Sequence, residues 1–154
     1  MIREWAEELA KPSEFNNGVP SCPYALEALD RGEVKTVVAT DLWSEVLHEC
    51  LQFFAGANKV TIFLDEGYDG EYEDLENACM ALNRFFAETN QDLWLLCYLD
   101  EVAVVFVQRW SELETAAAKL EKLGYYANYD ADDYRNHILT RRDRRSQNAW
   151  NDAR

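Results

Sequence analysis

From Val34 onward, short apolar runs alternate with amphipathic stretches, and this order limits the possible folds more than any other feature. Runs of strand type lie at 34–40, 59–64, 93–99 and 102–109. Apolar residues at helical spacing lie at 41–56, from an acidic loop to about residue 89, and at 111–124. The predicted order is therefore β-α-β-α-β-β-α. Two short helices, at 2–11 and 23–30, precede it on either side of a Pro- and Asn-rich loop.

Each β-α-β crossover is right-handed, so the first two strands are expected to be parallel. Asp100-Glu101 between the last two strands predicts an antiparallel hairpin. This is the element order of a minimal thioredoxin-like domain, and we expect an α/β fold of that type. Another two-layer α/β sandwich, for example a ferredoxin-like one, is the alternative. We expect one α/β domain over 1–137 and an Arg-rich tail over 138–154.

Local signals refine this outline. Asp41 is predicted to be the N-cap of the helix over 41–56. The residues expected on the buried stripe of that helix are Leu42, Val46, Leu47, Cys50, Leu51 and Phe54. Ser111 and Glu114 form a predicted capping box, and Gly124 is predicted to end that helix. The run at 93–99 is apolar on both faces, which is typical of a central strand.

Charge is unevenly distributed along the 154 residues. The whole chain carries a net charge of −14, but residues 138–154 contain five arginines and only two aspartates. An acidic body repels nucleic acid and anionic membranes, and it attracts cations and basic proteins. No apolar run reaches membrane-spanning length, and the N-terminus lacks the pattern of a signal peptide. We therefore expect a cytoplasmic protein that binds a protein partner or self-associates, without membrane or nucleic acid.

Cysteine usage indicates one candidate catalytic residue. The four cysteines form no CxxC motif, and Cys50, Cys79 and Cys97 fall in apolar surroundings typical of buried residues. Cys22 instead precedes Pro23, a residue favoured at the first helical position. Cys22 would then be an N-cap, where unpaired N–H groups and the helix dipole stabilise a thiolate. No phosphate-binding loop or other cofactor motif is present, and we predict no cofactor.

The acidic loop before the second long helix is a candidate metal site. Its carboxylates match positions 1, 5, 7 and 12 of a calcium-binding loop, and Gly70 falls on the position that requires glycine. The predicted ligands are Asp65, Asp69, Glu71 and Glu76. A strand precedes this loop where a calcium-binding loop has a helix, so a solvated acidic connection is the alternative interpretation.

The C-terminal part combines aromatic residues with arginine, the residue types that contribute most to protein interfaces. A basic tail on an acidic body also favours docking within the chain or onto a neighbouring copy. The predicted binding residues are Tyr125, Tyr126, Tyr129, Arg141, Arg142, Arg144, Arg145 and Trp150.

Two resemblances involve the segment around Cys22. Cys22-Pro23-Tyr24-Ala25 resembles the glutaredoxin motif with its second cysteine replaced, but it precedes the first strand instead of following it. Together with Trp5 and Asp30-Arg31-Gly32-Glu33-Val34, this segment also resembles a small bacterial family of unknown function. Its members carry a tryptophan, a Cys-Pro-Phe-Ala string and a Glu-Arg-Gly-x-Val strand entry. The resemblance implies a compact cytoplasmic domain with Cys22 as the residue of interest.

The preferred interpretation is an acidic binding or accessory module without a redox centre. A thiol-dependent enzyme or redox sensor that uses Cys22 is a second hypothesis. A third is an acidic mimic of nucleic acid that inhibits a basic protein.

Overall fold

The computed structural model describes residues 2–144, which form two compact units. One unit is Gly32–Ser111, and the other joins residues 2–31 to residues 112–144. Each unit is described by itself below.

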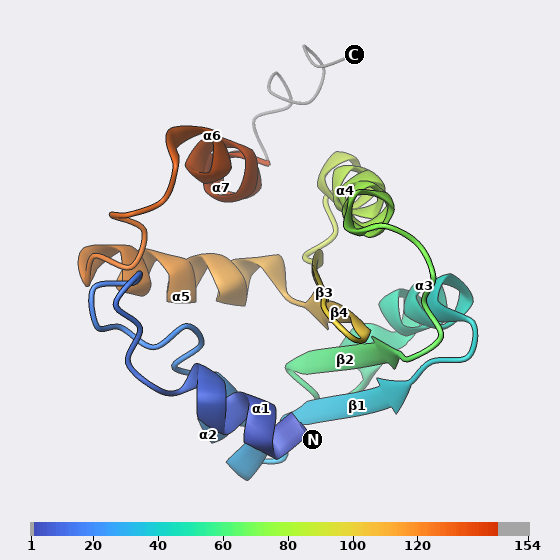
Figure 1. Ribbon diagram of the computed structural model, residues 1–154. Helices are drawn as coiled ribbons and strands as arrows, with labels where there is room; N and C mark the ends of the chain where they lie inside the picture. Colours follow the sequence, from blue (N-terminus) through green and yellow to red (C-terminus); the bar gives the residue numbers. More distant parts are fainter. Residues whose placement is uncertain (1, 145–154) are drawn as a thin grey trace. The chain divides into compact units, whose positions relative to one another are not determined.

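The unit Gly32–Ser111 has the predicted alternation of strands and helices (Figure 1). Its elements are β1 (Val34–Val38), α3 (Leu42–Gln52), η1 (Phe53–Ala55), β2 (Val60–Asp65), α4 (Tyr72–Glu88), β3 (Trp94–Leu99) and β4 (Ala103–Gln108). β1 and β2 are parallel, whereas β2 pairs with β4 and β4 with β3 in antiparallel orientation. The α/β class, the parallel first pair and the final hairpin are confirmed.

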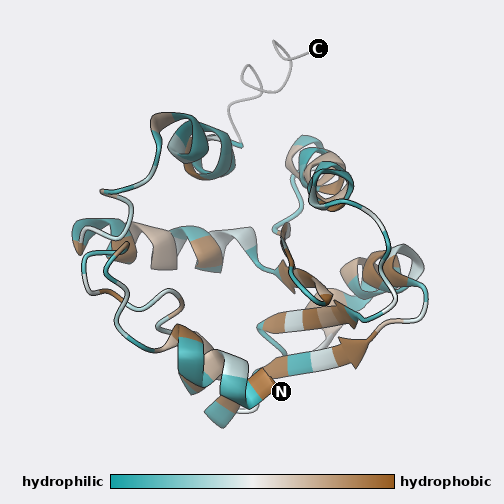
Figure 2. Ribbon diagram, in the orientation of Figure 1, coloured by the Kyte–Doolittle hydropathy of each residue, from teal (hydrophilic) through white to brown (hydrophobic). Residues whose placement is uncertain are grey.

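The sheet order is β1-β2-β4-β3, so β3 is an edge strand. The prediction of a central strand at 93–99 is therefore wrong. β3 consists of apolar and aromatic residues along its whole length, and Figure 2 shows that most residues of the sheet are coloured as hydrophobic. The apolar pattern of a strand indicates whether its two faces are covered by other parts of the protein. It does not indicate whether a second strand pairs with each of its edges.

α3 and α4 lie over one face of the sheet, and the core of this unit lies between them and the strands. Side chains alternate along each strand, so Phe63, Leu95 and Val105 point into this core. From the helices, Val46 and Leu75 are fully buried against them. This layer determines which side of α3 faces the sheet.

The buried stripe of α3 differs from the predicted one. Leu42, Val46 and Cys50 are buried as expected, but Glu49 and Phe53 complete the stripe. Leu47, Leu51 and Phe54 are exposed, Leu51 at 89%. The helix is thus rotated from the orientation that apolarity alone predicts. The reason is that Glu49 has polar partners on the sheet.

The second unit contains short helices and the longer α5. Its elements are α1 (Ile2–Leu9), α2 (Ala25–Asp30), α5 (Trp110–Lys122), α6 (Ala131–Asp133), the π-helical η2 (Tyr134–Leu139) and α7 (Thr140–Arg142). The predicted boundary between domain and tail at 137/138 lies inside η2.

Three hydrogen bonds connect the N-terminal loop of this unit to the segment after α5. Asn17 donates to the carbonyl of Gly124, Tyr125 to that of Ser21, and Asn128 to that of Phe15. Gly124 has a φ of +83°, the left-handed conformation that glycine adopts after a helix, as predicted.

The predicted capping box at the start of α5 is wrong. α5 begins at Trp110, and Ser111 donates its backbone N–H and its hydroxyl to Asp92, at 2.8 and 2.6 Å. Glu114 instead accepts a hydrogen bond from Arg141. Among residues 2–144, no helix has the length and apolarity needed to span a membrane.

Candidate functional site

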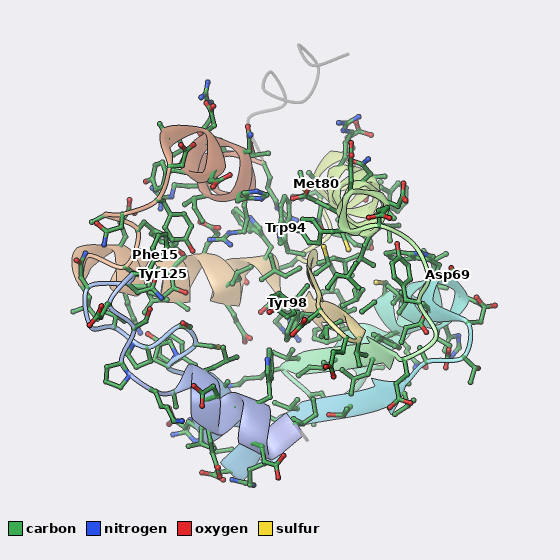
Figure 3. All side chains as sticks on the ribbon, viewed as in Figure 1. Phe15, Asp69, Met80, Trp94, Tyr98 and Tyr125 are labelled. Atoms are coloured by element: carbon green, nitrogen blue, oxygen red, sulfur yellow. The ribbon has the colours of Figure 1, made fainter. Side chains whose placement is uncertain are left out.

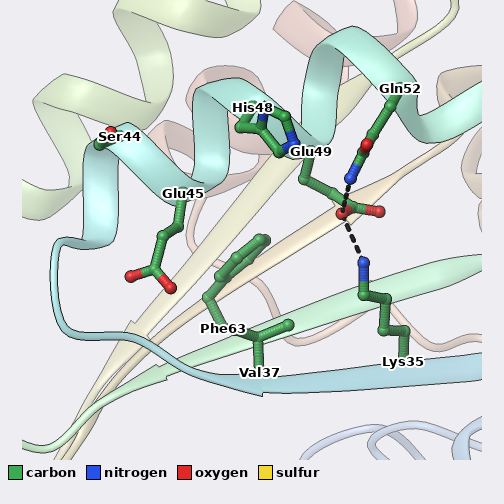
Figure 4. A pocket seen from close by; sticks show the side chains of 8 residues that line it. All are labelled: Lys35, Val37, Ser44, Glu45, His48, Glu49, Gln52 and Phe63. Carbon is green, nitrogen blue, oxygen red and sulfur yellow. Dashed lines mark hydrogen bonds and ion pairs between the residues drawn. The ribbon is translucent and has the colours of Figure 1, made fainter.

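A pocket of about 450 Å³ opens between β1 and α3 (Figure 4). Val37 and Phe63 supply its apolar floor from the sheet, and Lys35 stands beside them on β1. The α3 residues that line the pocket are Ser44, Glu45, His48, Glu49 and Gln52. The pocket is an open hollow with an apolar floor and a mostly polar wall, so a ligand group would be held there chiefly by polar contacts.

Glu49 is the organising residue of this pocket. Its Oε2 accepts from Lys35 Nζ at 2.9 Å and from Gln52 Nε2 at 3.4 Å, and its Oε1 accepts from Thr61 at 3.0 Å. The side chain is only 8% exposed. Burial alone would raise the pKa of this carboxyl, but the hydrogen bonds from Lys35, Thr61 and Gln52 together lower it. Glu49 is therefore a fixed negative charge and a poor general base.

Glu45 supplies a second carboxylate, one helical turn before Glu49. Its Oε2 accepts from the backbone N–H groups of Thr40 and Asp41, each at 2.9 Å. These bonds cap α3, a role that the sequence assigned to Asp41, whose side chain makes no capping bond. A carboxylate accepts about four hydrogen bonds, so Glu45 has acceptor capacity beyond these two.

The charges of the pocket favour a cationic ligand group. Two carboxylates face one ammonium, and Lys35 already donates to Glu49. The net charge of −14 strengthens the attraction of cations to any acidic hollow on the chain. Ser44 and His48 add further polar side chains to the lining.

An exposed apolar stripe lies on the same helix as the pocket. Leu47 and Leu51 are one turn apart on α3, and Phe54 follows in η1. The guanidinium of Arg109 stands over the Phe54 ring, 4.6 Å from its centre. Exposed apolar residues grouped in this way are typical of contact surfaces.

Cys22, the candidate catalytic residue, is not the predicted N-cap. α2 begins at Ala25 with Tyr24 in the capping position. Burial raises the pKa of the Cys22 thiol, and hydrogen bonds from the N–H groups of Ala25 and Tyr24 offset only part of this effect. The local geometry therefore gives Cys22 no activated thiolate.

The predicted binding tyrosines lie together in an aromatic cluster. Tyr125, Tyr126 and Tyr129 contact one another, and Phe15 lies against Tyr129. Figure 3 labels two members of this cluster, Phe15 and Tyr125. Tyr126 also meets Tyr134. Burial raises the pKa of Tyr125 and Tyr129.

The predicted binding arginines contact acids on α5. Arg141 is 5% exposed and pairs with Glu114, and Arg142 donates to Glu121 at 2.6 Å. Arg144 is also buried. Arg145 and Trp150 lie outside the described residues. These contacts agree with docking of the C-terminal segment within the chain.

The predicted metal ligands are not brought together. Asp65 accepts from the N–H of Gly67, Glu71 belongs to the capping box of α4, and Glu76 interacts with Tyr72 inside that helix. Within residues 2–144, no group of three or more Asp, Glu, His or Cys side chains is arranged to hold a metal ion. The acidic loop functions as the N-terminal cap of α4.

No family model, curated protein or solved structure matches this chain. The resemblance around Cys22 stays a prediction. The pocket residues Lys35 and Glu49 were not among the predicted site residues. The signal for them was an acid at position 49, on the helical face shared with Leu42, Val46 and Phe53, and a lysine within a strand.

Proposed function

We propose that this protein is a binding module without a redox centre, and that it takes a cationic group of a protein partner in the β1–α3 pocket. The observation that carries this proposal is the fixed pair of carboxylates, Glu45 and Glu49, above an apolar floor. Leu47 and Leu51 lie on another side of the same helix, two residues after Glu45 and Glu49, so a partner that crosses over α3 from the pocket would contact them with its apolar residues. A basic segment with alternating arginine and leucine has the required chemistry.

Net charge favours a different protein over a second copy. Two chains of charge −14 repel each other, whereas a basic segment is attracted to the same surface. The arginines of the C-terminal segment that the structure describes are already engaged with Glu114 and Glu121. We therefore propose the β1–α3 pocket, and not the C-terminal segment predicted from the sequence, as the surface that contacts a partner.

The fold positions the pocket residues on adjacent elements, β1, β2 and α3. A thioredoxin-like relationship is supported by the order of the elements along the chain. The order of the strands in the sheet, β1-β2-β4-β3, gives it no further support. The proposed function does not depend on this classification. It depends on the packing of α3 across β1 and β2.

A titration followed by amide NMR signals tests the proposal. The probe is a short synthetic peptide of alternating arginine and leucine, and its counterpart with glutamate in place of arginine is the negative control. We expect shifts of the β1 and α3 signals with the basic peptide, and weaker binding as salt rises. Shifts confined to other elements would contradict the proposal.

Charge variants separate this pocket from general attraction to an acidic protein. Glu45→Gln keeps the capping oxygen and removes the charge, and we expect affinity to fall about fivefold. Glu101→Gln, in the turn between β3 and β4, makes the same charge change away from α3. Equal losses in the two variants would show that only the net charge matters.

A further inference from the structure

Two cysteine thiols contact each other in the unit Gly32–Ser111. Cys79, on α4, is part of the buried core of this unit, and Cys97, on β3, packs against that core, where the two thiols interact. Cys79 is buried and Cys97 is half-buried, and neither is in a disulfide bond in this structure. The sequence places them 18 residues apart without any recognisable motif. Their meeting is a product of the fold.

The register of α4 on β3 explains the contact. Asn83 on α4 is hydrogen-bonded to both the N–H and the carbonyl of Leu95 on β3. Cys79 lies one helical turn before Asn83, a rise of about 6 Å. Cys97 lies two residues after Leu95 on the same strand face, a step of about 6.6 Å. The two steps match, so the fixed pair Asn83–Leu95 brings the two sulfurs together.

The surroundings distinguish Cys97 from the other three cysteines. The hydrogen bond from Cys79 lowers the pKa of Cys97 against the effects of burial and of Glu76, and a hydrogen bond from the Tyr72 phenol lowers it further. Burial raises the pKa of Cys22, and it raises that of Cys50 to about 12. The hydrogen bond to Cys97 and burial raise that of Cys79. Cys97 is also the more exposed member of the pair, so a small oxidant from solvent reaches it before Cys79.

We propose that Cys79 and Cys97 are a modification site, which a hydroperoxide oxidises to an intrachain disulfide. The Cys97 thiolate attacks the peroxide oxygen, the O–O bond breaks, and the leaving alkoxide or hydroxide takes up a proton. Cys97 is then a sulfenic acid. The sulfur of Cys79 attacks the Cys97 sulfur and releases hydroxide, which takes the Cys79 proton and leaves as water. Two electrons pass from the thiols to the peroxide.

This site is independent of the proposed binding function. The pocket lies between β1 and α3, whereas the thiol pair lies between α4 and β3. The pair is a target of oxidation and is not a catalytic centre. The sequence predicted Cys22 as the candidate redox-sensitive residue, whereas this proposal assigns that sensitivity to Cys97.

A disulfide map of the full chain tests the proposal. The folded protein is treated with hydrogen peroxide, unfolded in the presence of an alkylating reagent and digested without reduction. We expect the peptides of Cys79 and Cys97 to be linked, with the mass of two hydrogen atoms lost, and Cys22 and Cys50 to be alkylated. Any other pairing, or sulfinic acid at Cys97 with Cys79 alkylated, would overturn it. Alkylation of all four thiols would overturn it as well.

Variants test the order of events. Cys97→Ser should slow the peroxide-dependent loss of thiols at least about fivefold, whereas Cys22→Ser should leave the rate unchanged. Cys79→Ser keeps a hydrogen-bond donor beside Cys97 but cannot form the disulfide, so it should leave a sulfenic acid at Cys97 that dimedone traps. A faster loss at Cys22 than at Cys97 would contradict the assignment. The wild-type map decides the pairing even where a variant fails to fold.

Discussion

The side-chain amide of Asn83 pairs with both backbone polar groups of Leu95. Asn83 Nδ2 donates to the Leu95 carbonyl at 2.9 Å, and the Leu95 N–H donates to Asn83 Oδ1 at 2.7 Å. β3 is an edge strand, and an unpaired edge is a template for pairing with another chain. Asn83 occupies these two groups as a further strand would. It therefore closes this part of the edge and anchors α4 to the sheet.

Asn83→Ala is expected to lower the free energy of unfolding by about 2–4 kcal/mol. The substitution leaves the N–H and the carbonyl of Leu95 without the amide, and unsatisfied buried polar groups are costly. Urea unfolding measures the loss. Asn77→Ala, at an exposed position of the same helix, should change stability by less than about 0.5 kcal/mol. Similar losses in both variants would show that the amide does not anchor the strand.

Glu49→Gln is expected to destabilise the protein by about 1–2 kcal/mol at pH 7, because the charged hydrogen bond to Lys35 is weakened. The pKa of Glu49 is lower in the folded protein than its ordinary value of 4.5. Its stabilising contribution is therefore complete above that value and is lost as the pH falls through the folded pKa.

Urea unfolding of the two proteins at pH 7 and near pH 3 checks the Glu49 prediction. The gap between wild type and Glu49→Gln should narrow toward the lower pH. Glu66→Gln, at an exposed position, is the control and should change stability at pH 7 by less than about 0.5 kcal/mol. A gap of constant size would mean that Glu49 is not held as a carboxylate by its partners.

The ion pair between Arg141 and Glu114 is expected to hold the C-terminal helical segment on α5. Both side chains are largely buried, at 6% and 15% exposure, and the loss of one partner leaves a buried charge. Arg141→Met should cost about 3 kcal/mol of stability. A double-mutant cycle with Glu114→Gln should show coupling, whereas Arg135→Met at an exposed ion pair should cost little. Additive effects of the two substitutions would contradict a direct pair.

Tyr72→Phe is expected to slow alkylation of Cys97 at neutral pH. The phenol hydrogen bond lowers the pKa of Cys97, so its removal raises that pKa and reduces the thiolate fraction. Rates measured with iodoacetamide across pH, with mass-spectrometric assignment of each cysteine, report the shift. Tyr98→Phe removes a phenol from the opposite face of β3 and should leave the profile unchanged. If the pH dependence of Cys97 alkylation is the same in Tyr72→Phe as in the wild type, the phenol of Tyr72 does not affect the pKa of Cys97.

Local sequence determined the existence of most elements in this protein. Strand runs and helical spacing predicted four strands and the three helices between and after them, within a few residues of the observed limits. Gly124 predicted the end of α5, because the left-handed conformation there suits glycine. These features depend on residues that are close together in the chain, so the spacing of apolar residues and the position of glycine are sufficient to predict them.

Only the tertiary structure decided which polar residues turn inward. Apolar spacing predicted that Leu47 and Leu51 face the core, but a buried Glu49 with partners on two strands rotates α3 away from that orientation. Asn83 turns inward for the same kind of reason, since Leu95 offers both a donor and an acceptor. No window of local sequence contains either partner, so neither orientation could be predicted.

The same distinction separates Cys22 from the Cys79–Cys97 pair. Cys22 stood out because Pro23 follows it, a local signal, yet burial raises its pKa. Cys79 and Cys97 carry no local signal and meet because α4 packs on β3 in the register that Asn83 and Leu95 fix. The sequence determined the elements, because hydrophobic period and backbone preference are local. The tertiary structure decided the contacts, because hydrogen bonds between distant residues set how each element is turned.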